Sequence, residues 1–334
     1  MNIKDYSGVT VFCEQREQVI SKVSFELIGK ARSIADQIHK KVTAVILGYN
    51  IESQCQELIN YGADHVIFVD KKELEIYTTE SYAQALTMVL ENTKPEIVLV
   101  GATSIGRDLA PRVSSRLETG LTADCTSLEI GENDELLMTR PAFGGNIMAT
   151  IVCPDHRPQM STVRAGVMLM LDRDENRTGS IEKMDVKFTD SIHRVKVLEV
   201  VKEEKEEASI TEASILVSGG RGVGSKENFD MLTEVAHLLK GTVSASRAVI
   251  DAGWYDHSRQ VGQTGSTVRP DIYLACGISG AIQHVAGMEE SDYIIAINKD
   301  TDAPIFDVAD FGIVGDLKKI LPVLMEEIRL LIKE

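Results

Sequence analysis

The residues best placed to do chemistry are the six between 219 and 224, which read Gly-Gly-Arg-Gly-Val-Gly. A β-rich run at 214–217 precedes them, and a helical pattern at 227–240 follows. A turn in that place offers a phosphate free backbone N–H groups and the positive end of a helix dipole. Arg221 would add a charge-assisted contact. The spacing matches neither GxGxxG nor the P-loop, since Ser225 stands where the P-loop lysine belongs. A tight turn that binds nothing therefore fits this segment equally well.

Three further clusters of glycine and polar residues follow this turn. They are Ser246-Arg247 with the nearby run at 251–254, the run Val-Gly-Gln-Thr-Gly at 261–265, and the run at 277–284. In the third cluster, glycines again lie between a predicted strand and the start of a helix, which indicates a second anion-binding turn. Two such turns in one small domain favour a dinucleotide with a pyrophosphate over a single phosphate group.

The elements that must position these clusters form two α/β regions. In the first hundred residues, predicted strands at 9–13, 42–47, 66–69 and 97–100 alternate with predicted helices at 24–39, 55–61 and 81–90. Four β–α repeats predict a Rossmann-like, mostly parallel sheet with right-handed crossovers. Beyond residue 210, strands at 214–217, 272–275 and 293–297 and a helix at 317–333 predict a second, doubly wound α/β domain.

The middle of the chain has a different pattern. Runs at 136–140 and 147–153 flank Pro-Ala-Phe-Gly-Gly-Asn at 141–146 and predict two antiparallel strands with a glycine-containing loop. A further strand is predicted at 195–201. The run Lys-Glu-Glu-Lys-Glu-Glu at 202–207 is interpreted as a solvated linker, with a surface helix turn as the rival. The predicted domains are therefore residues 1–205 and 210–334.

Composition excludes several classes of function. A formal net charge of −16 argues against binding to nucleic acid, whose phosphates need a basic face. No apolar run approaches the roughly 20 residues of a membrane span, and the N-terminus has no signal-peptide pattern. The five scattered cysteines form no CxxC, so they are expected to be small core residues of a cytoplasmic protein rather than disulfides or metal ligands.

Residues 246–316 resemble the alpha subunit of electron transfer flavoproteins. The segments that carry the resemblance are SRAVIDAGW, VGQTG, TVRPDIYLACGISGAIQHVAGM, IIAINKD and APIFDVADFGIVGD. The N-terminal half adds the weaker matches VGATSIGRDLAPRVSSRLETGLTADC and TRPAFGGNIMATI. The resemblance implies an FAD-bound carrier of single electrons. Such a carrier turns over no substrate alone, so no catalytic residue is expected, and neither is a metal.

The resemblance also implies which residues hold the cofactor in the C-terminal domain. They are Arg221, Ser246, Arg247, Val261, Gly262, Gln263, Thr264, Ser279, Gly280, Ala281, Ile282, Gln283, His284, Asn298, Asp316 and Leu317. The run at 261–264 would follow the isoalloxazine ring, with the Thr264 hydroxyl near N5. The run at 279–284 would cradle phosphate and ring, with His284 near the C2 carbonyl. Asn298 and the pair at 316–317 would hold the ribose–adenine end.

The chemistry of these side chains agrees with such roles. Ser246 and Arg247 would lie on the flavin and pyrophosphate side, and Arg221 would reach in from the glycine turn. A half-reduced flavin carries negative charge over N1 and C2=O, which a His284 donor and the Arg247 cation would stabilise. A hydrogen bond to a charged group contributes about 1.5–3 kcal/mol. For a one-electron couple this is roughly 60–130 mV.

The resemblance implies partners as well. The expected unit is a heterodimer with a beta subunit, and the loop at 141–146 is either an interface element or an ordinary hairpin tip. The redox partner would be an acyl-CoA dehydrogenase or a related flavoenzyme. The run Thr-Val-Arg-Pro at 267–270 resembles electron-bifurcating members, which take electrons from NADH through a second FAD held mainly by the beta subunit. The alternatives are a simple shuttle to a quinone-linked acceptor, a dehydrogenase with its own substrate pocket, and a nucleotide sensor.

Overall fold

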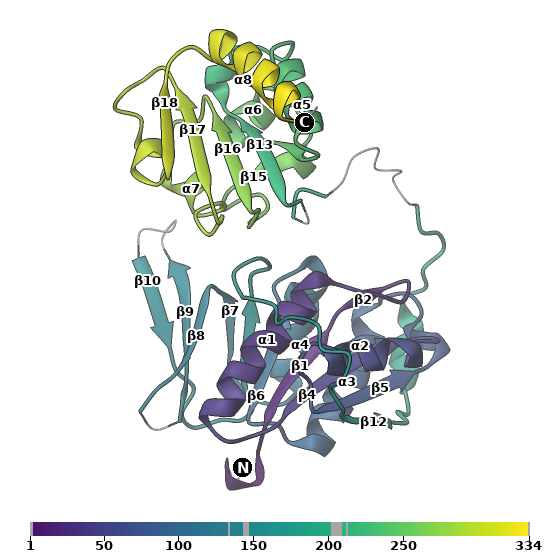
Figure 1. The fold of residues 1–334 in the computed structure, drawn as a ribbon. Coiled ribbons are helices and arrows are strands. Elements are labelled where there is room, and N and C mark those ends of the chain that lie inside the picture. Colours follow the sequence, from purple (N-terminus) through teal and green to yellow (C-terminus); the bar gives the residue numbers. More distant parts are fainter. Residues whose placement is uncertain (1–2, 133, 143–146, 202–208, 212, 333–334) are drawn as a thin grey trace. The chain divides into compact units, whose positions relative to one another are not determined.

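The structure, a computed structural model, describes residues 3–132, 134–142, 147–201, 209–211 and 213–332. The chain divides into two compact units, one formed by residues up to 142 and 148–201, the other by residues from 202 onward (Figure 1). The charged run at 202–207 and the loop residues 143–146, to which roles were assigned from the sequence, lie outside the described residues. None of the described helices combines the length and the hydropathy of a membrane-crossing segment.

The first unit is built on a parallel sheet of seven strands. Their spatial order is β12 (Ser180–Lys183), β5 (His65–Asp70), β4 (Val42–Gly48), β1 (Val9–Cys13), β6 (Ile97–Gly101), β11 (Gln159–Val163) and β7 (Leu121–Cys125). Helices α1 (Lys22–Gln37) and α2 (Cys55–Asn60) cover one face, and α3 (Thr79–Thr93) and α4 (Ser104–Arg116) cover the other. With both faces covered, β1 and β6 are buried along their whole length. The predicted Rossmann-like architecture is confirmed.

Smaller strands complete the first unit. They are the antiparallel pair β2 (Gln15–Arg16) and β3 (Val19–Ile20), and a three-stranded sheet of β8 (Ser127–Ile130), β9 (Leu136–Ala142) and β10 (Ile147–Ile151). β9 and β10 are neighbours in that sheet, as predicted from the runs at 136–140 and 147–153.

Strand prediction was wrong at one segment and missed several strands, among them β7, β8, β14 (Thr242–Ser246), β15 (Gln260–Val261) and β18 (Phe311–Val314). The segment 195–201 contains no strand; its apolar side chains include Leu198, which is 90% exposed, and no neighbouring strand pairs with it. Conversely, β11 and β12 were not predicted. β11 is buried although it contains Gln159, Ser161 and Thr162, and β12 is a short, exposed strand at the edge of the sheet.

The second unit is built on a six-stranded parallel sheet. The order is β15 (Gln260–Val261), β14 (Thr242–Ser246), β13 (Ile215–Gly219), β16 (Ile272–Cys276), β17 (Ile294–Asn298) and β18 (Phe311–Val314). The chain starts at the central β13, adds strands on one side, and then crosses to the other side at β16. This is the doubly wound order that was predicted. Dinucleotides bind to such sheets beyond the carboxyl ends of the strands, where the order reverses.

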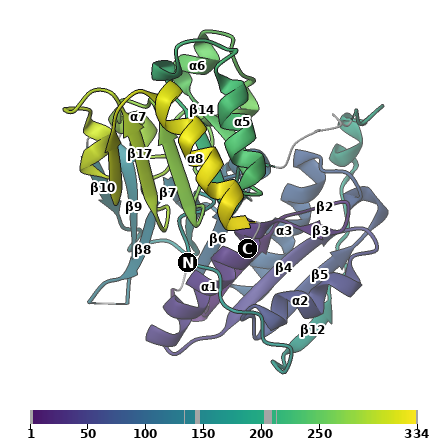
Figure 2. The same ribbon diagram turned by 45° about the horizontal axis from the view of Figure 1, so that its top comes forward.

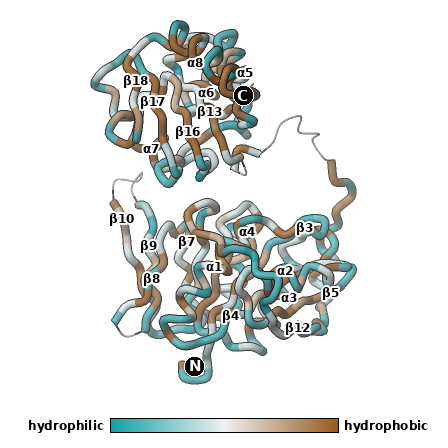
Figure 3. Tube along the Cα trace, viewed as in Figure 1, coloured by the Kyte–Doolittle hydropathy of each residue, from teal (hydrophilic) through white to brown (hydrophobic). Residues whose placement is uncertain are grey.

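Helices cover the second sheet and leave its carboxyl edge to the turns. α5 (Phe229–Leu238), α6 (Arg247–Asp251) and α8 (Leu317–Ile332) share an apolar cluster on one face. α5 and α8 lie side by side in both ribbon views (Figures 1 and 2). On the other face, Tyr273, Met288 and Ile305 belong to a second cluster, and the short α7 (Ile282–Val285) follows β16. Apolar residues concentrate in the strands, whereas many turns are hydrophilic (Figure 3).

Candidate functional site

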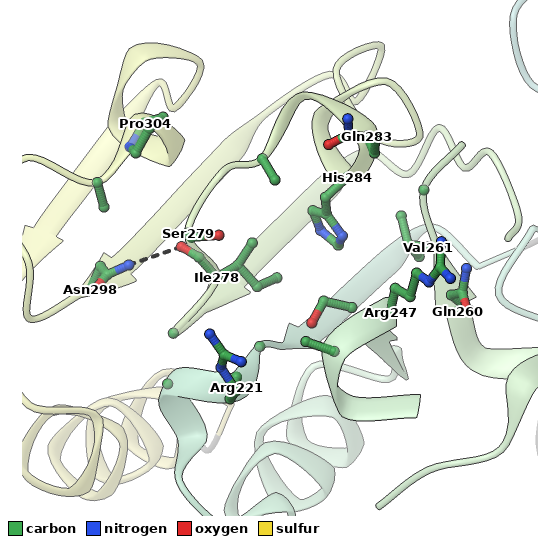
Figure 4. A pocket seen from close by; sticks show the side chains of 18 of the residues that line it. Arg221, Arg247, Gln260, Val261, Ile278, Ser279, Gln283, His284, Asn298 and Pro304 are labelled. Atoms are coloured by element: carbon green, nitrogen blue, oxygen red, sulfur yellow. Dashed lines mark hydrogen bonds between the residues drawn. The ribbon is translucent and has the colours of Figure 1, made fainter. Parts of the chain in front are cut away.

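A pocket of about 750 Å³ lies at the carboxyl ends of the strands in the second unit, where the strand order reverses (Figure 4). The end of β13 and its turn contribute one wall, and the turn after β16 contributes another. Eleven of the sixteen residues predicted to hold a cofactor line it: Arg221, Ser246, Arg247, Val261, Gly262, Thr264, Ser279, Ala281, Gln283, His284 and Asn298. The fold therefore brings together residues that are up to 77 positions apart (298 − 221).

The other five predicted residues do not line this pocket; Gln263 and Gly280 lie in the turns around it, and Ile282 is the first residue of α7. The N–H of Gln263 donates to the carbonyl of Gln283 at 2.7 Å, which ties the 261–265 loop to α7. A Cβ at Gly280 would lie 2.1 Å from the backbone nitrogen of Ile305, so this glycine permits close packing. The side chain of Ile282 is exposed. A contact between these residues and a cofactor stays a prediction.

Asp316 and Leu317 lie where β18 leads into α8. The Asp316 carboxylate accepts the N–H of Lys318 at 3.0 Å in the first turn of that helix. Leu317 is buried in the apolar cluster shared by α5, α6 and α8. Both residues therefore have a structural role in starting α8, and their predicted role at the ribose–adenine end remains untested.

Two glycine turns interlock at the base of the pocket. The N–H of Gly220 donates to the carbonyl of Cys276 at 2.8 Å, and the N–H of Gly222 donates to that of Gly277 at 3.0 Å. A Cβ at Gly220 would lie 2.2 Å from the Gly277 oxygen, and Gly277 itself has φ +63°. Glycine is thus required because the turns touch. The prediction that the N–H groups of this turn are free is wrong for Gly220 and Gly222, and also for Val223 and Gly224, which donate to carbonyls within the turn.

The charges around the pocket favour an anion bearing hydroxyl groups. Its lining contains the cations Arg221, Arg247 and Lys299 and the carboxylates Asp251 and Asp300. Arg247 is 67% exposed, and its Nε lies 3.4 Å from Asp251 Oδ2, one helical turn along α6. Three cations against two carboxylates make the pocket locally positive in a chain of net charge −16. The carboxylates can accept hydrogen bonds from sugar hydroxyls.

His284 is the buried polar group of the site. Its side chain is 7% exposed, and its ring extends from α7 toward the middle of the pocket (Figure 4). Nε2 lies 2.9 Å from Tyr273 Oη, whereas Nδ1 is buried with no hydrogen bond of regular geometry to the described residues. Burial lowers the pKa of His284 to about 4, and a hydrogen-bonding contact with the Val261 carbonyl opposes this shift. A neutral imidazole beside a pocket, with one nitrogen that makes no regular hydrogen bond to the described residues, favours a ligand that completes its hydrogen bonding.

Several lining residues were not predicted. The buried Gln260 donates from Nε2 to Thr264 Oγ1 at 2.9 Å and so orients the hydroxyl of the loop. Lys299 and Asp300 follow β17 directly. Lys299 and Asp300 could have been predicted from the sequence, because residues that follow neighbouring parallel strands meet at one edge of a sheet. Asn298, predicted at this edge, donates from Nδ2 to the carbonyl of Ile278 at 2.9 Å (Figure 4).

The donors and acceptors of this pocket suit binding rather than bond cleavage. No group of three or more His, Cys, Asp or Glu side chains in the described part of the chain could hold a metal ion. The lining supplies cations, a neutral imidazole, hydroxyls and carboxylates around a cavity at a dinucleotide-binding position. The close glycine backbone, and an Nδ1 without a regular hydrogen bond to the described residues, fit a cofactor with phosphates and a ring that bears a hydrogen-bond acceptor.

Comparison with known proteins agrees with this geometry. Residues 9–189 match the sequence profile of the electron transfer flavoprotein domain, and residues 209–289 match that of the electron transfer flavoprotein FAD-binding domain. "Protein FixB" of Clostridium saccharobutylicum is 56% identical, with 98% of each chain covered. "Electron transfer flavoprotein subunit alpha" of Thermoanaerobacterium thermosaccharolyticum is 55% identical, with 98% of this chain and 99% of the relative covered. "Lactate dehydrogenase (NAD(+),ferredoxin) subunit LctC" of Acetobacterium woodii is 48% identical, covering 96% of this chain and 76% of the relative.

Proposed function

We propose a function from the premise that this chain belongs to the electron transfer flavoprotein family and is an alpha subunit of it. Its function is electron transfer, and its cofactor is FAD. In the proposal, the pocket at the strand-order reversal holds FAD, and the chain passes electrons between NADH or a dehydrogenase and an acyl-CoA dehydrogenase-type partner. The observation that carries the proposal is the buried Nδ1 of His284, which makes no regular hydrogen bond to the described residues, beside a pocket lined by cations and interlocked glycines.

Different residues of this chain would bind different parts of FAD. Arg221 and Lys299 neutralise the diphosphate, and the carboxylate of Asp300 accepts from a sugar hydroxyl. His284 would donate from Nδ1 to a carbonyl of the ring system, and Thr264, oriented by its bond to Gln260, would supply a hydroxyl to the cofactor. FAD supplies the redox chemistry when bound, and the chain tunes it through these contacts.

The proposed assembly is a heterodimer with the beta subunit of the family, and the proposed mode is electron bifurcation from NADH. The run at 267–270 supports this, as does a relative whose name includes both NAD(+) and ferredoxin. In this segment Val268 is buried, and its N–H donates to the carbonyl of Gly287 at 2.9 Å. Through this bond the segment is attached to the chain just after α7, which carries His284.

Two measurements test the proposal on the co-expressed heterodimer. Purified protein should be yellow and should contain FAD, and a colourless protein that fails to take up added FAD would refute the carrier function. For bifurcation, two FAD per heterodimer are expected, and anaerobic stopped-flow mixing with NADH should reduce flavin. Two FAD with no NADH oxidation would reduce the proposal to a simple shuttle between a dehydrogenase and a quinone-linked acceptor.

A further inference from the structure

We propose that Tyr273 is a positioning residue that fixes the tautomer of His284, so that Nδ1 carries the proton and presents an N–H donor to the pocket. This inference rests on the proposed function for its meaning, because the bound cofactor is the ligand that would share that N–H with the Val261 carbonyl. The tautomer itself is a property of the cofactor-free protein and can be measured without FAD.

The geometry places the phenol directly behind the imidazole. Tyr273 lies in β16 with no exposed surface, and His284 lies in α7 at 7% exposure. Oη and Nε2 are 2.9 Å apart, within the range of a strong hydrogen bond. The strand thus supports the back of the ring, and the front nitrogen, Nδ1, is left without a regular hydrogen bond in the described part of the chain.

The number of protons in this pair limits the arrangements to two. Burial raises the pKa of the Tyr273 phenol and lowers that of His284 to about 4, so near pH 7 both groups are neutral. Either the phenol donates to Nε2 and Nδ1 carries the imidazole proton, or Nε2–H donates to the phenol and Nδ1 is a bare lone pair. The carbonyl of Val261 lies near His284 and favours the protonated ring. An acceptor beside the ring is attracted to an N–H and repelled by a lone pair, which favours the first arrangement.

Two buried serines support the same direction from behind the phenol. Ser218 in β13 and Ser244 in β14 are paired in register and have no exposed surface. Their hydroxyls lie close enough to Tyr273 to oppose the rise of its pKa, and neither makes a regular hydrogen bond to the described residues. Each can donate to the phenol oxygen while the phenol donates to Nε2. Successive hydrogen bonds of one direction strengthen one another.

The test is a measurement of the His284 tautomer by ¹⁵N NMR. The heterodimer would be labelled with ¹⁵N-histidine, assigned with His284→Gln, and recorded near pH 7 before and after removal of FAD. We expect Nδ1 to carry the proton in both forms. Tyr273→Phe should give a mixture of tautomers and weaken FAD about fivefold, the factor expected for one neutral hydrogen bond.

Two further variants make the result specific. Tyr255→Phe removes a phenol hydroxyl that lies 3.4 Å from Thr233, away from the pocket, and should change neither tautomer nor FAD affinity. The double variant Ser218→Ala, Ser244→Ala keeps the phenol and remains usable if Tyr273→Phe does not fold. It removes the donors to Oη, so the Nε2–H tautomer should appear.

The outcomes separate this inference from the function on which it rests. An Nε2–H tautomer in the wild type would overturn the inference, as would unchanged His284 signals in Tyr273→Phe. A double serine variant with unchanged His284 signals would overturn it as well. If the wild-type chain shows the Nδ1–H tautomer but never binds FAD, the proposed cofactor site fails while the role of Tyr273 stands.

Discussion

Gly220→Ala should open the base of the pocket by forcing the two glycine turns apart. The added Cβ would lie 2.2 Å from the Gly277 oxygen and 2.7 Å from its carbon. An ordinary C···O contact is longer by about 1 Å, so the turns must separate by a similar distance. The backbone of Gly220 has φ −101°, which alanine adopts freely, so the penalty comes from this contact alone. Overpacking of this kind costs about 1–3 kcal/mol, and the bond from Gly222 to Gly277 contributes about 1 kcal/mol more.

The assay is urea unfolding of the FAD-free protein, followed by tryptophan fluorescence. Trp254 is the one tryptophan in the sequence, and its ring lies 6.3 Å from that of Phe229 in the second unit. Its fluorescence therefore reports the unit that contains the pocket. We expect the free energy of unfolding to fall by about 2–4 kcal/mol. FAD affinity should fall about tenfold or more, because the phosphate side of the pocket is displaced.

Gly253→Ala is the matched control. Gly253 has φ +71° with nothing within 4 Å of its added Cβ, so it measures the penalty of the left-handed backbone without a clash. That penalty is about 1–2 kcal/mol, and FAD affinity should stay unchanged. The interlock would be refuted if Gly220→Ala unfolded at the wild-type urea concentration and bound FAD within about twofold of the wild type.

Three other predictions follow from burial and charge. His284 has a pKa of about 4 in the folded protein against an ordinary 6.5, so the unfolded chain binds the proton more readily. The free energy of unfolding should therefore fall by about 3 kcal/mol as the pH drops from 6.5 to 4. Urea titrations of His284→Gln that kept this part of the pH dependence would contradict the prediction. Arg221→Ala should lower the affinity for FAD about ten- to hundredfold in equilibrium dialysis. The control Arg329→Ala, which breaks an α8 ion pair with Glu234, should change that affinity less than about twofold. Equal losses in the two variants would argue against a direct contact between Arg221 and phosphate. The half-buried Cys153 should react with a thiol reagent in the native protein. The buried cysteines should react only in denaturant, because burial raises the pKa of thiols such as Cys276 to about 12. Uniform labelling of the cysteines in mass spectrometry would contradict this prediction.

The architecture could be predicted where hydrophobic pattern alone decides it. β1, β4 and β6 are apolar runs buried on both faces, and the residues between them have helical spacing. β11 escaped prediction because its buried residues include polar side chains, which no hydrophobic pattern identifies. Gln159 Oε1 accepts the N–H of Leu136 at 3.0 Å. The segment 195–201 shows the converse, since apolar residues form a strand only where a neighbouring strand is available.

The site could be predicted as far as local motifs reach. Residues at or just beyond strand ends, such as Arg221 and Ser246, were identified because they lie in clusters of glycine and polar residues. The pairing of Tyr273 with His284 could not be predicted, because it joins a strand to the helix after it through side chains whose directions depend on packing. The interlock of Gly220 and Gly277 was missed for a similar reason: each turn suggests a ligand by itself, and only the folded sheet shows that the turns contact one another.

That contact has a consequence for how the chain can change over generations. Because the Gly220 and Gly277 turns fill the same space, a side chain tolerated in one turn requires a retreat of the other, and neither turn can make that adjustment alone. A single substitution at either position therefore costs stability, even though the two lie 57 residues apart (277 − 220). Changes in one turn are accepted more readily when the other turn shifts with it, so the two turns constrain one another.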